Sequence, residues 1–383
     1  MASRSLNAAK SGHRTLSGAK KAKQAEFYTQ YVDIQKEVEA YLEFDADSFR
    51  GKVVYCNCDD PRESKFFEYF ATNFSKLGLK RLIATSYDGS SIAGTRSLFP
   101  EYDEGNGRRK KPKAMAVVLD HVKDEDGDGT ANMTDVELFL KRNKAARLAL
   151  KGNDKYPGGD FRSPECVEFL KQADIVVTNP PFPLFREYVA QLVKHKKKFL
   201  IIGNTNAITY KEVFPLIKDN KMWLGCTNFN VGMFFEVPAH WERFHHIDEA
   251  TGRKIARVST ACWYTNMDHG RRHLPLSLMT LSDNLKYSKN LREKAAYDRY
   301  DNYDAIEVGT YKEIPSDYDG VMGVPITFLD KYSPDQFEIL GHMVSTKVDE
   351  YNHGYPYING KKVYARILIR HYRPARRTQG TKE

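Results

Sequence analysis

The chain has 383 residues, of which 41% are hydrophobic, and this is enough apolar material for a catalytic core with an appended module. Its 59 Lys and Arg outnumber 50 Asp and Glu, giving a formal net charge of +9, and no apolar run approaches the roughly 20 residues of a membrane span. Five cysteines without a CxxC pair argue against a disulfide framework or a zinc site and predict a reduced, cytoplasmic protein.

The chain begins with a basic arm. Residues 1–24 contain no acidic residue and few bulky apolar ones, and they include Lys20, Lys21 and Lys23. Such a composition predicts disorder in the absence of substrate. A basic arm suits a polyanionic partner, most simply nucleic acid, and a solvated tail without a binding role remains the alternative.

Strands alternate with helices through the next part of the chain. Amphipathic patterns predict helices over residues 26–42, 64–77, 135–150 and 184–194. Short β-branched runs predict strands over residues 52–56, 81–85, 115–119, 174–177 and 198–202. Residues 233–237 and 261–265 are also strand-like and suit the far edge of the same sheet. This alternation predicts an α/β fold with a doubly wound sheet.

The composition changes after about residue 268, where the pattern becomes irregular and rich in Tyr, Arg and Asp. This change predicts a boundary between a catalytic domain over residues 25–267 and a second region over residues 268–383. The end of the second region is basic and carries Arg366, Arg370, Arg373, Arg376 and Arg377. Together with the N-terminal arm, these arginines are candidates for binding double-stranded DNA.

The most informative segment is Asn179-Pro180-Pro181-Phe182, which follows the predicted strand over residues 174–177. In an open α/β sheet, ligands bind at this end of the strands. The two prolines stiffen the loop. The Asn179 side chain and the Pro180 carbonyl can accept both hydrogens of one exocyclic amine, and Phe182 offers a face to a flat ring. The segment therefore predicts a catalytic loop for methyl transfer to an amino group, with a plain proline-rich turn as the alternative.

With this loop in place, the chain resembles the EcoRI-type adenine-specific DNA methyltransferases, which are bacterial restriction-modification or orphan enzymes that use S-adenosylmethionine. Similar segments span nearly the whole chain and are EFYTQY (Glu26–Tyr31), VVYCNCDDP (Val53–Pro61), GDFRSPE (Gly159–Glu165), GVPITFLDKY (Gly323–Tyr332), FEILG (Phe337–Gly341) and INGKKVYARILIRH (Ile358–His371). The resemblance implies a class I, Rossmann-like methyltransferase fold with a C-terminal target-recognition region. It also implies a cytoplasmic, DNA-associated enzyme of bacterial or phage origin.

The resemblance implies which residues bind the cofactor. Tyr28 and Thr29 look like the element that lines its methionine end, although a helix start with a Thr cap is the plain alternative. Asp160 and Phe161 are similar to the pair that bonds and stacks its adenine ring, and Asn179 also contacts it. A turn around Gly158-Gly159-Asp160 is the alternative for this second segment.

Three further polar residues, Asn57, Asp59 and Asp60, follow the first strand, where carboxylates can pair with the cofactor's amino group. The glycine-rich turn that most methyltransferases carry here is absent, so the backbone approaches a ligand less closely. Asp88 follows the second strand and is the nearest candidate for holding the ribose hydroxyls.

These residues together predict an enzyme that flips an adenine out of the duplex and methylates its N6 amine. No titrating base is needed, because the proton can leave after methyl transfer. We expect a monomer, with a cognate restriction endonuclease as a possible second component of the system. Three other functions stay open: methylation of adenine or guanine in RNA, methylation of a protein amide, and DNA binding without catalysis.

Two segments imitate metal sites. The acidic loop from Asp124 to Asp135 has the spacing of a calcium loop, but its twelfth residue is Asp and a strand-like segment precedes it, so we expect a solvated loop. His245 and His246 are adjacent, and we expect them to point apart on a surface loop. No metal is predicted.

Overall fold

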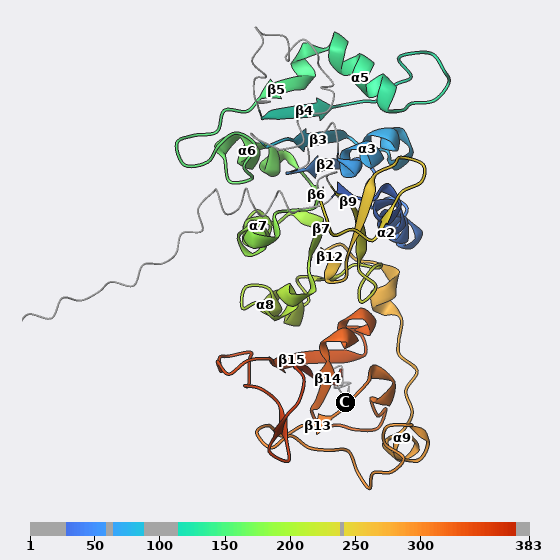
Figure 1. The fold of residues 1–383 in the computed structure, drawn as a ribbon, viewed down its shortest axis with the longest axis vertical. Coiled ribbons are helices and arrows are strands. Elements are labelled where there is room, and N and C mark those ends of the chain that lie inside the picture. The colour runs from blue at the N-terminus through green and yellow to red at the C-terminus, as the bar shows by residue number, and fades with distance from the viewer. Residues whose placement is uncertain (1–27, 59–63, 88–113, 238–240, 373–383) are drawn as a thin grey trace, which may run out of the picture.

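The computed structural model describes residues 28–58, 64–87, 114–237 and 241–372, and its centre is a sheet of eight strands (Figure 1). The strands lie in the order β5-β4-β3-β2-β6-β7-β12-β8. Their bounds are β2 (Val53–Cys56), β3 (Arg81–Thr85), β4 (Met115–Leu119), β5 (Arg147–Ala149), β6 (Ile175–Thr178), β7 (Lys198–Asn204), β8 (Trp223–Leu224) and β12 (Ala261–Thr265).

The middle of this sheet is parallel and its strand order reverses beside β2. Strands β3, β2, β6 and β7 are parallel neighbours, whereas β4, β5, β12 and β8 complete the sheet in antiparallel pairs. The chain runs from β2 to β3 on one side and later returns to β6 on the other side. Such a reversal opens a crevice at the carboxyl ends of the strands, which is where α/β sheets bind ligands.

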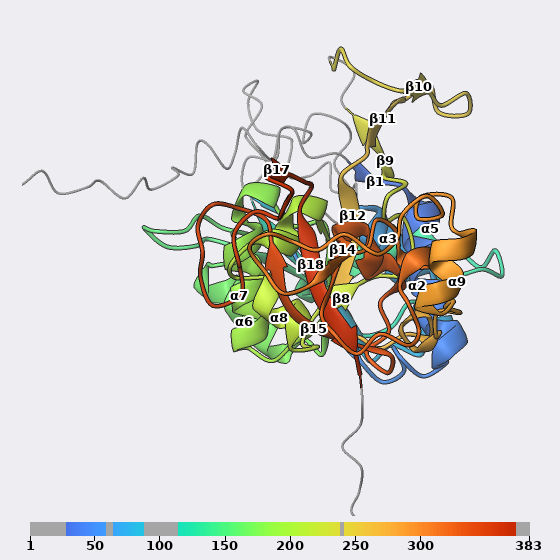
Figure 2. The ribbon, with the colours of Figure 1, turned by 90° about the horizontal axis from the view of Figure 1, so that it is seen from below.

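Helices cover both faces of the sheet because both faces are apolar. Along β2, Val53 and Tyr55 pack into one hydrophobic cluster and Val54 and Cys56 into the other. One face carries α2 (Tyr31–Phe44), α3 (Lys65–Thr72), α4 (Phe74–Leu77) and α5 (Met133–Arg142), and the other carries α6 (Pro164–Gln172), α7 (Phe185–Lys194) and α8 (Phe214–Lys218) (Figures 1 and 2). The α/β prediction is therefore confirmed. Within the described residues, no helix is long and apolar enough to span a membrane.

Three sequence-based boundaries are wrong. The first helix does not begin at residue 26, because residues Tyr28–Thr29 form strand β1 before α2. The helix predicted over residues 64–77 divides into α3 and α4 at Asn73. The helix predicted over residues 135–150 ends at Arg142, and β5 follows because its backbone pairs with the edge strand β4.

A second sheet stands at the carboxyl edge of the first. It has the order β1-β9-β11-β10, with β9 (Met233–Val237), β10 (His246–Ile247) and β11 (Lys254–Val258). The expectation that residues 233–237 extend the central sheet is wrong, because β9 pairs with β1 and β11. Only residues 259–260 separate β11 from β12, whose first residue Ala261 pairs with Asn204 at the end of β7.

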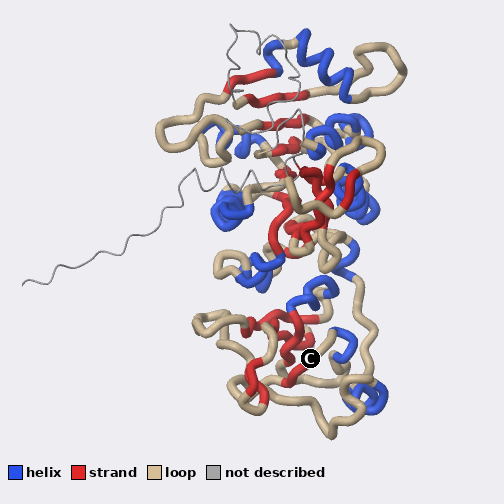
Figure 3. The backbone as a smooth tube through the Cα atoms, in the orientation of Figure 1, coloured by secondary structure: helices blue, strands red, loops and turns tan. Residues whose placement is uncertain are grey.

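The last part of the chain forms a third sheet below the first, surrounded by loops (Figures 1 and 3). Its order is β13-β14-β18-β15, with β13 (Ile306–Glu307), β14 (Met322–Pro325), β15 (Phe337–Met343) and β18 (Arg366–His371). Helix α9 (Leu281–Tyr287) precedes it, and a hairpin of β16 (Tyr357–Ile358) and β17 (Lys361–Lys362) interrupts it. The boundary at residue 268 stays a prediction.

One hydrophobic core runs from the central sheet into this C-terminal region. At the junction, the ring of Phe214 in α8 stacks on His342 in β15, with 3.9 Å between ring centroids. Burial lowers the pKa of His342 to about 4, so the imidazole is neutral at pH 7 and packs as an aromatic ring.

A polar joint lies beside this core. The short helix η5 (Gly270–His273) places Arg271 2.9 Å from Asp330 of the C-terminal region. His273 lies between two carboxylates, with Nδ1 2.8 Å from Asp335 and Nε2 3.0 Å from Asp268. Hydrogen bonds to Asp335 and Asp268 raise the pKa of the His273 imidazole, so the joint favours its charged form.

The joint should make stability depend on pH. Because the native pKa of His273 is raised, its contribution is fully present below the unfolded value of about 6.5 and is lost as pH rises through the native value. We expect the urea midpoint of the wild type to fall more than that of His273→Gln between about pH 6 and about pH 9. His121→Gln, an exposed histidine elsewhere, is the control. Equal pH dependence of the urea midpoint in wild type and His273→Gln would show that the charged form of His273 does not stabilise the fold.

Candidate active site

The carboxyl ends of β2, β3 and β6 meet at Asn57, which is 1% exposed. The Thr85 hydroxyl at the end of β3 donates to Asn57 Oδ1 at 3.3 Å, and the Thr178 hydroxyl at the end of β6 donates to the Asn57 carbonyl. The sequence analysis did not identify either threonine. Thr85 is the last residue of the strand predicted over residues 81–85, and Thr178 directly follows the strand predicted over residues 174–177. Asn57 thus connects the carboxyl ends of β2, β3 and β6 through buried hydrogen bonds. Its direct contact with a cofactor stays a prediction.

The turn after β2 contains a residue in a backbone conformation that glycine favours, although that residue is a cysteine. Cys58 has a φ of 65°, in the left-handed region that disfavours any residue with a Cβ. Its Sγ lies 3.5 Å from Asn57 Oδ1, a weak hydrogen bond at best. The sequence departs from the common glycine-rich turn in residue type, while the backbone keeps the conformation that glycine favours.

The predicted catalytic loop lies directly after Thr178. Pro180 and Pro181 are buried, whereas Asn179 and Phe182 are half-buried. The Pro181 carbonyl accepts a hydrogen bond from the Leu184 N–H at 2.8 Å, which starts the short helix η3 (Phe182–Leu184) leading into α7. The prolines therefore anchor the loop. Asn179 and Phe182 remain partly accessible, whereas Pro180, whose carbonyl is also a predicted acceptor, is buried.

The loop around Asp160 approaches the end of β3. Gly159 has a φ of 77°, and a Cβ there would lie 1.9 Å from the Ser86 carbonyl oxygen, so only glycine fits. Asp160 is 4% exposed and lies beside this contact. The close approach brings the predicted adenine-binding segment to the same edge of the sheet as Asn57.

Arg162, which sequence reasoning missed, holds the Asp160 carboxylate. Its backbone N–H and its Nε donate to Oδ1 at 2.8 and 2.9 Å, and its Nη2 donates to Oδ2 at 2.8 Å. The hydrogen bonds from Arg162 to Asp160 in turn raise the pKa of the guanidinium, so the arginine stays charged. Since a carboxylate has about four acceptor positions, Oδ2 can still accept from a ligand.

Phe161 is buried against α7. Its ring is 2% exposed and packs edge-on against Tyr188 of α7, with 4.9 Å between centroids. Gln191 also donates to its carbonyl at 3.0 Å. The Arg162 guanidinium also lies over this ring, 5.1 Å from its centroid. Stacking of Phe161 on an adenine stays a prediction.

Thr29 has the character of a ligand-binding residue. In β1 it pairs through its backbone with Phe235, and Tyr28 pairs with Glu236. Thr29 is 4% exposed, and its Oγ1 has no hydrogen-bond partner in the part of the chain that the structure describes. A buried hydroxyl without a partner costs free energy, which a polar ligand group would recover. The residue fits the polar end of a bound cofactor.

The basic residues divide into two groups. Arg366 is 8% exposed and forms a bidentate pair with Glu307, so its guanidinium belongs to the C-terminal sheet; this corrects the expectation that it binds DNA. Arg370 is half-exposed and lies 2.7 Å from Glu338. The predicted residues outside the described part of the chain are Lys20, Lys21, Lys23, Asp59, Asp60, Asp88, Arg373, Arg376 and Arg377.

The segments that imitate metal sites are both exposed. Carboxylate oxygens of Asp124, Asp126 and Asp128 lie within 4.8 Å of one another, and exposed acidic groups of this kind are common without an ion. Asp135 instead accepts from the Asn132 N–H at 2.7 Å and caps α5. The expectation that the adjacent histidines 245 and 246 point apart is wrong, because their Nδ1 atoms lie 3.0 Å apart.

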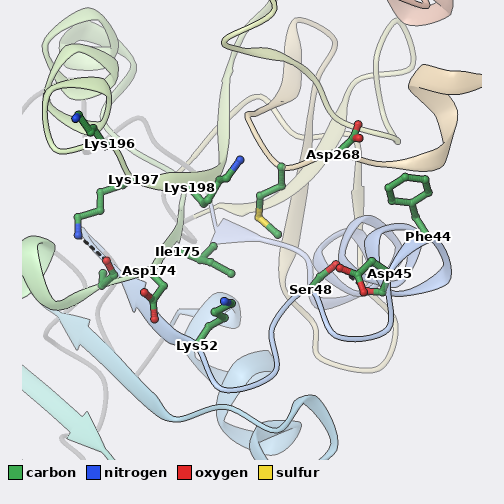
Figure 4. Close-up of a pocket in the computed structure, with 12 residues that line it drawn as sticks. Phe44, Asp45, Ser48, Lys52, Asp174, Ile175, Lys196, Lys197, Lys198 and Asp268 are labelled. Carbon is green, nitrogen blue, oxygen red and sulfur yellow. Dashed lines mark hydrogen bonds between the residues drawn. The ribbon is translucent and has the colours of Figure 1, made fainter. Parts of the chain in front are cut away.

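A pocket of about 440 Å³ lies at the opposite edge of the central sheet (Figure 4). It is lined by Lys52, Ile175 and Lys198, which stand at the beginnings of β2, β6 and β7. Lys197 donates from Nζ to the carbonyls of Lys171 and Ala173 at the end of α6, at 2.8 and 2.6 Å. This pocket is therefore separate from the crevice at the carboxyl ends.

Comparison with known proteins gives consistent matches. The family described as "Adenine-specific methyltransferase EcoRI" matches residues 15–372. The type II methyltransferase M.EcoRI of Escherichia coli is 45% identical over 370 residues, which cover 94% of this chain and 97% of that protein. The type II methyltransferases M.MgeORF184P of Mycoplasma genitalium and M.MpnI of Mycoplasma pneumoniae are 34% and 33% identical, with 92% of this chain covered in each case and 97% and 96% of their own lengths. No solved structure matches.

The left-handed turn after β2 can be tested by comparing two substitutions of Cys58. Both Cys58→Gly and Cys58→Ala remove the thiol, but only glycine removes the steric cost of a positive φ. We expect the glycine variant to be more stable than the alanine variant by about 1 kcal/mol in urea unfolding. An alanine variant of equal or greater stability would show that the turn does not adopt this conformation.

Proposed function

Because the chain belongs to the EcoRI family of adenine-specific methyltransferases, we propose that it methylates the N6 amine of adenine at a specific site in DNA. The observation that carries this proposal is the position of the Asn179-Pro180-Pro181-Phe182 loop. It lies at the end of β6, beside the point where the strand order reverses, and Thr178 fixes it to the end of β2. A planar substrate at this edge would meet an amide, a carbonyl and an aromatic ring together.

The fold supports a class I, Rossmann-like methyltransferase domain. Four central strands are parallel, helices cover both faces, and an antiparallel strand, β12, follows β7 at one side. The second and third sheets add to this core, and we propose that residues 268–383 form the target-recognition region. That assignment rests on the family and on the basic end of the chain.

We assign S-adenosylmethionine as the methyl donor, and when bound it supplies an electrophilic methyl group on a sulfonium. Thr29 would donate or accept at its methionine end through the buried hydroxyl. Asp160, held by Arg162, would accept a hydrogen bond from its adenine amine. The same site would use Tyr28, Asn57, Asp59 and Asp60, as the family resemblance implies.

Catalysis would depend on positioning. The target adenine leaves the duplex at a cost of a few kcal/mol and enters the crevice. The Asn179 side chain and the Pro180 carbonyl accept the two amine hydrogens, which directs the nitrogen lone pair, and Phe182 stacks on the base. No side chain has to remove a proton before the nitrogen reacts, so a perturbed general base is not required.

The remaining assignments follow from the same proposal. Double-stranded DNA would lie along the basic parts of the chain, and affinity would fall steeply with salt. We propose that the enzyme acts as a monomer in the cytoplasm, because each methylation event needs one active site. A cognate restriction endonuclease would complete a restriction-modification system of the type that the relatives' names indicate.

Methyl transfer from labelled S-adenosylmethionine tests the function directly. We expect label in unmethylated genomic DNA as N6-methyladenine, and we expect Asn179→Ala to lower the rate by about 100-fold or more, because it removes an acceptor from the reacting amine. Asn143→Ala, at the exposed end of α5, should keep the wild-type rate. Label in total RNA would favour the RNA enzymes, and tight DNA binding without label would favour a catalytically idle protein.

The buried hydroxyl of Thr29 gives a second test. Thr29→Val should weaken binding of S-adenosylmethionine by about 3- to 10-fold, which corresponds to one lost hydrogen bond. Thr29→Ser retains the hydroxyl and should restore most of the affinity. Calorimetric titration measures both, and unchanged affinity in the valine variant would remove Thr29 from the cofactor site.

A further inference from the structure

The C-terminal region carries a short, projecting β-hairpin. Tyr357 pairs with Lys362 and Ile358 pairs with Lys361. The two residues between them, Asn359 and Gly360, have φ values of 50° and 72°. Positive φ at both positions is the geometry of a type I′ turn, whose twist matches that of the strands. The hairpin is therefore a regular two-residue ribbon.

Its conformation is fixed by a neighbouring segment. The Asp301 carboxylate accepts from the Asn359 and Gly360 N–H groups at 3.0 and 2.8 Å, and the Asp301 N–H donates to the Tyr357 carbonyl at 2.8 Å. Asn302 donates to the Tyr355 carbonyl at 3.0 Å. A hairpin held at its turn and along one strand loses little conformational entropy when a partner binds it.

The exposed side chains of the hairpin are donors and aromatic rings. Tyr357, Asn359, Lys361 and Lys362 are exposed, and residues 351–372 contain no Asp or Glu. The Lys362 ammonium lies 3.1 Å from the centroid of the Tyr355 ring. This surface is complementary in charge to a polyanion, and its amide and ammonium groups can also donate to base edges.

The hairpin faces the same way as the catalytic edge. Figure 2 shows β17 on the side of the molecule where β1, β9 and β11 stand. Those strands rise from the carboxyl edge of the central sheet, since the end of β11 is two residues from the start of β12 beside the end of β7. A duplex lying along this side of the molecule would therefore face both the catalytic edge and the hairpin.

We propose that the β16–β17 hairpin enters the major groove of the target DNA and contacts base edges, so that it contributes to choosing the methylated sequence. This inference rests on the proposed function. A two-stranded ribbon fits the major groove, and Lys and Asn are side chains that read guanine and adenine there. Arg366 is unsuited to this task, because it is buried against Glu307.

The test compares two double variants with the same loss of charge. Lys361→Ala with Lys362→Ala removes the donors of the hairpin, and Lys76→Ala with Lys80→Ala removes two exposed lysines near the beginning of β3, at the opposite edge. Sequencing of sites methylated by the wild type first identifies the target. Steady-state methylation is then measured on that target and on targets with one base pair changed, at several salt concentrations.

We expect the hairpin variant to lose about 10-fold or more in kcat/KM on the true target and less on changed targets, so that discrimination narrows. Its affinity for S-adenosylmethionine and its melting temperature should equal those of the wild type, and the control variant should keep full discrimination. Asp301→Ala, which frees the turn, should change discrimination in the same direction.

Two results would overturn the inference. Wild-type kinetics in the hairpin variant would show that the hairpin does not touch DNA. An equal loss on all targets, with a smaller salt dependence, would show phosphate contact without base contact. Absence of DNA methylation by the wild type would instead reject the proposed function, and this outcome is seen before any variant is measured.

Discussion

The hydrogen bond from the Thr178 hydroxyl to the Asn57 carbonyl is the contact on which the site depends. It joins the two strands between which the strand order reverses, so it fixes the catalytic loop relative to the turn after β2. The Thr85 hydroxyl draws the end of β3 to the same residue. Because both hydrogen bonds are buried, water does not compete for them, and the crevice keeps one shape.

Packing also fixes the C-terminal region relative to the central sheet. The apolar face of the sheet that packs α7 and α8 continues through Phe214 into β15, so the two parts share a core. A shared core permits little relative motion. The distance between the catalytic loop and any DNA-reading element is thereby set by packing, which a site-specific enzyme requires if one base is to be placed while its neighbours are recognised.

The sequence predicted those strands whose own residues have a clear apolar pattern. Residues 81–85 and 115–119 form strands with the predicted bounds, because short apolar runs of this length are typical of buried strands. Strand β5 was predicted as the end of a helix, because its pairing with β4 is not visible in the local sequence. Strand β9 has the predicted bounds but was placed in the wrong sheet, because its pairing with β1 and β11 is not visible there either. The catalytic loop was predicted from its motif and stays a prediction. Arg162 was missed, because its importance lies in the carboxylate that it holds.

The sequence does not show which charged side chains are exposed, and the two arginines of β18 are an example. Arg366 and Arg370 are four residues apart on one strand, yet the first is buried in an ion pair and the second is half-exposed. Composition counts them equally, although burying an arginine requires a fixed partner such as Glu307. The β16–β17 hairpin, in contrast, carries Lys361 and Lys362 in exposed positions. The shape of the chain, more than its net charge, therefore determines which cations can meet DNA.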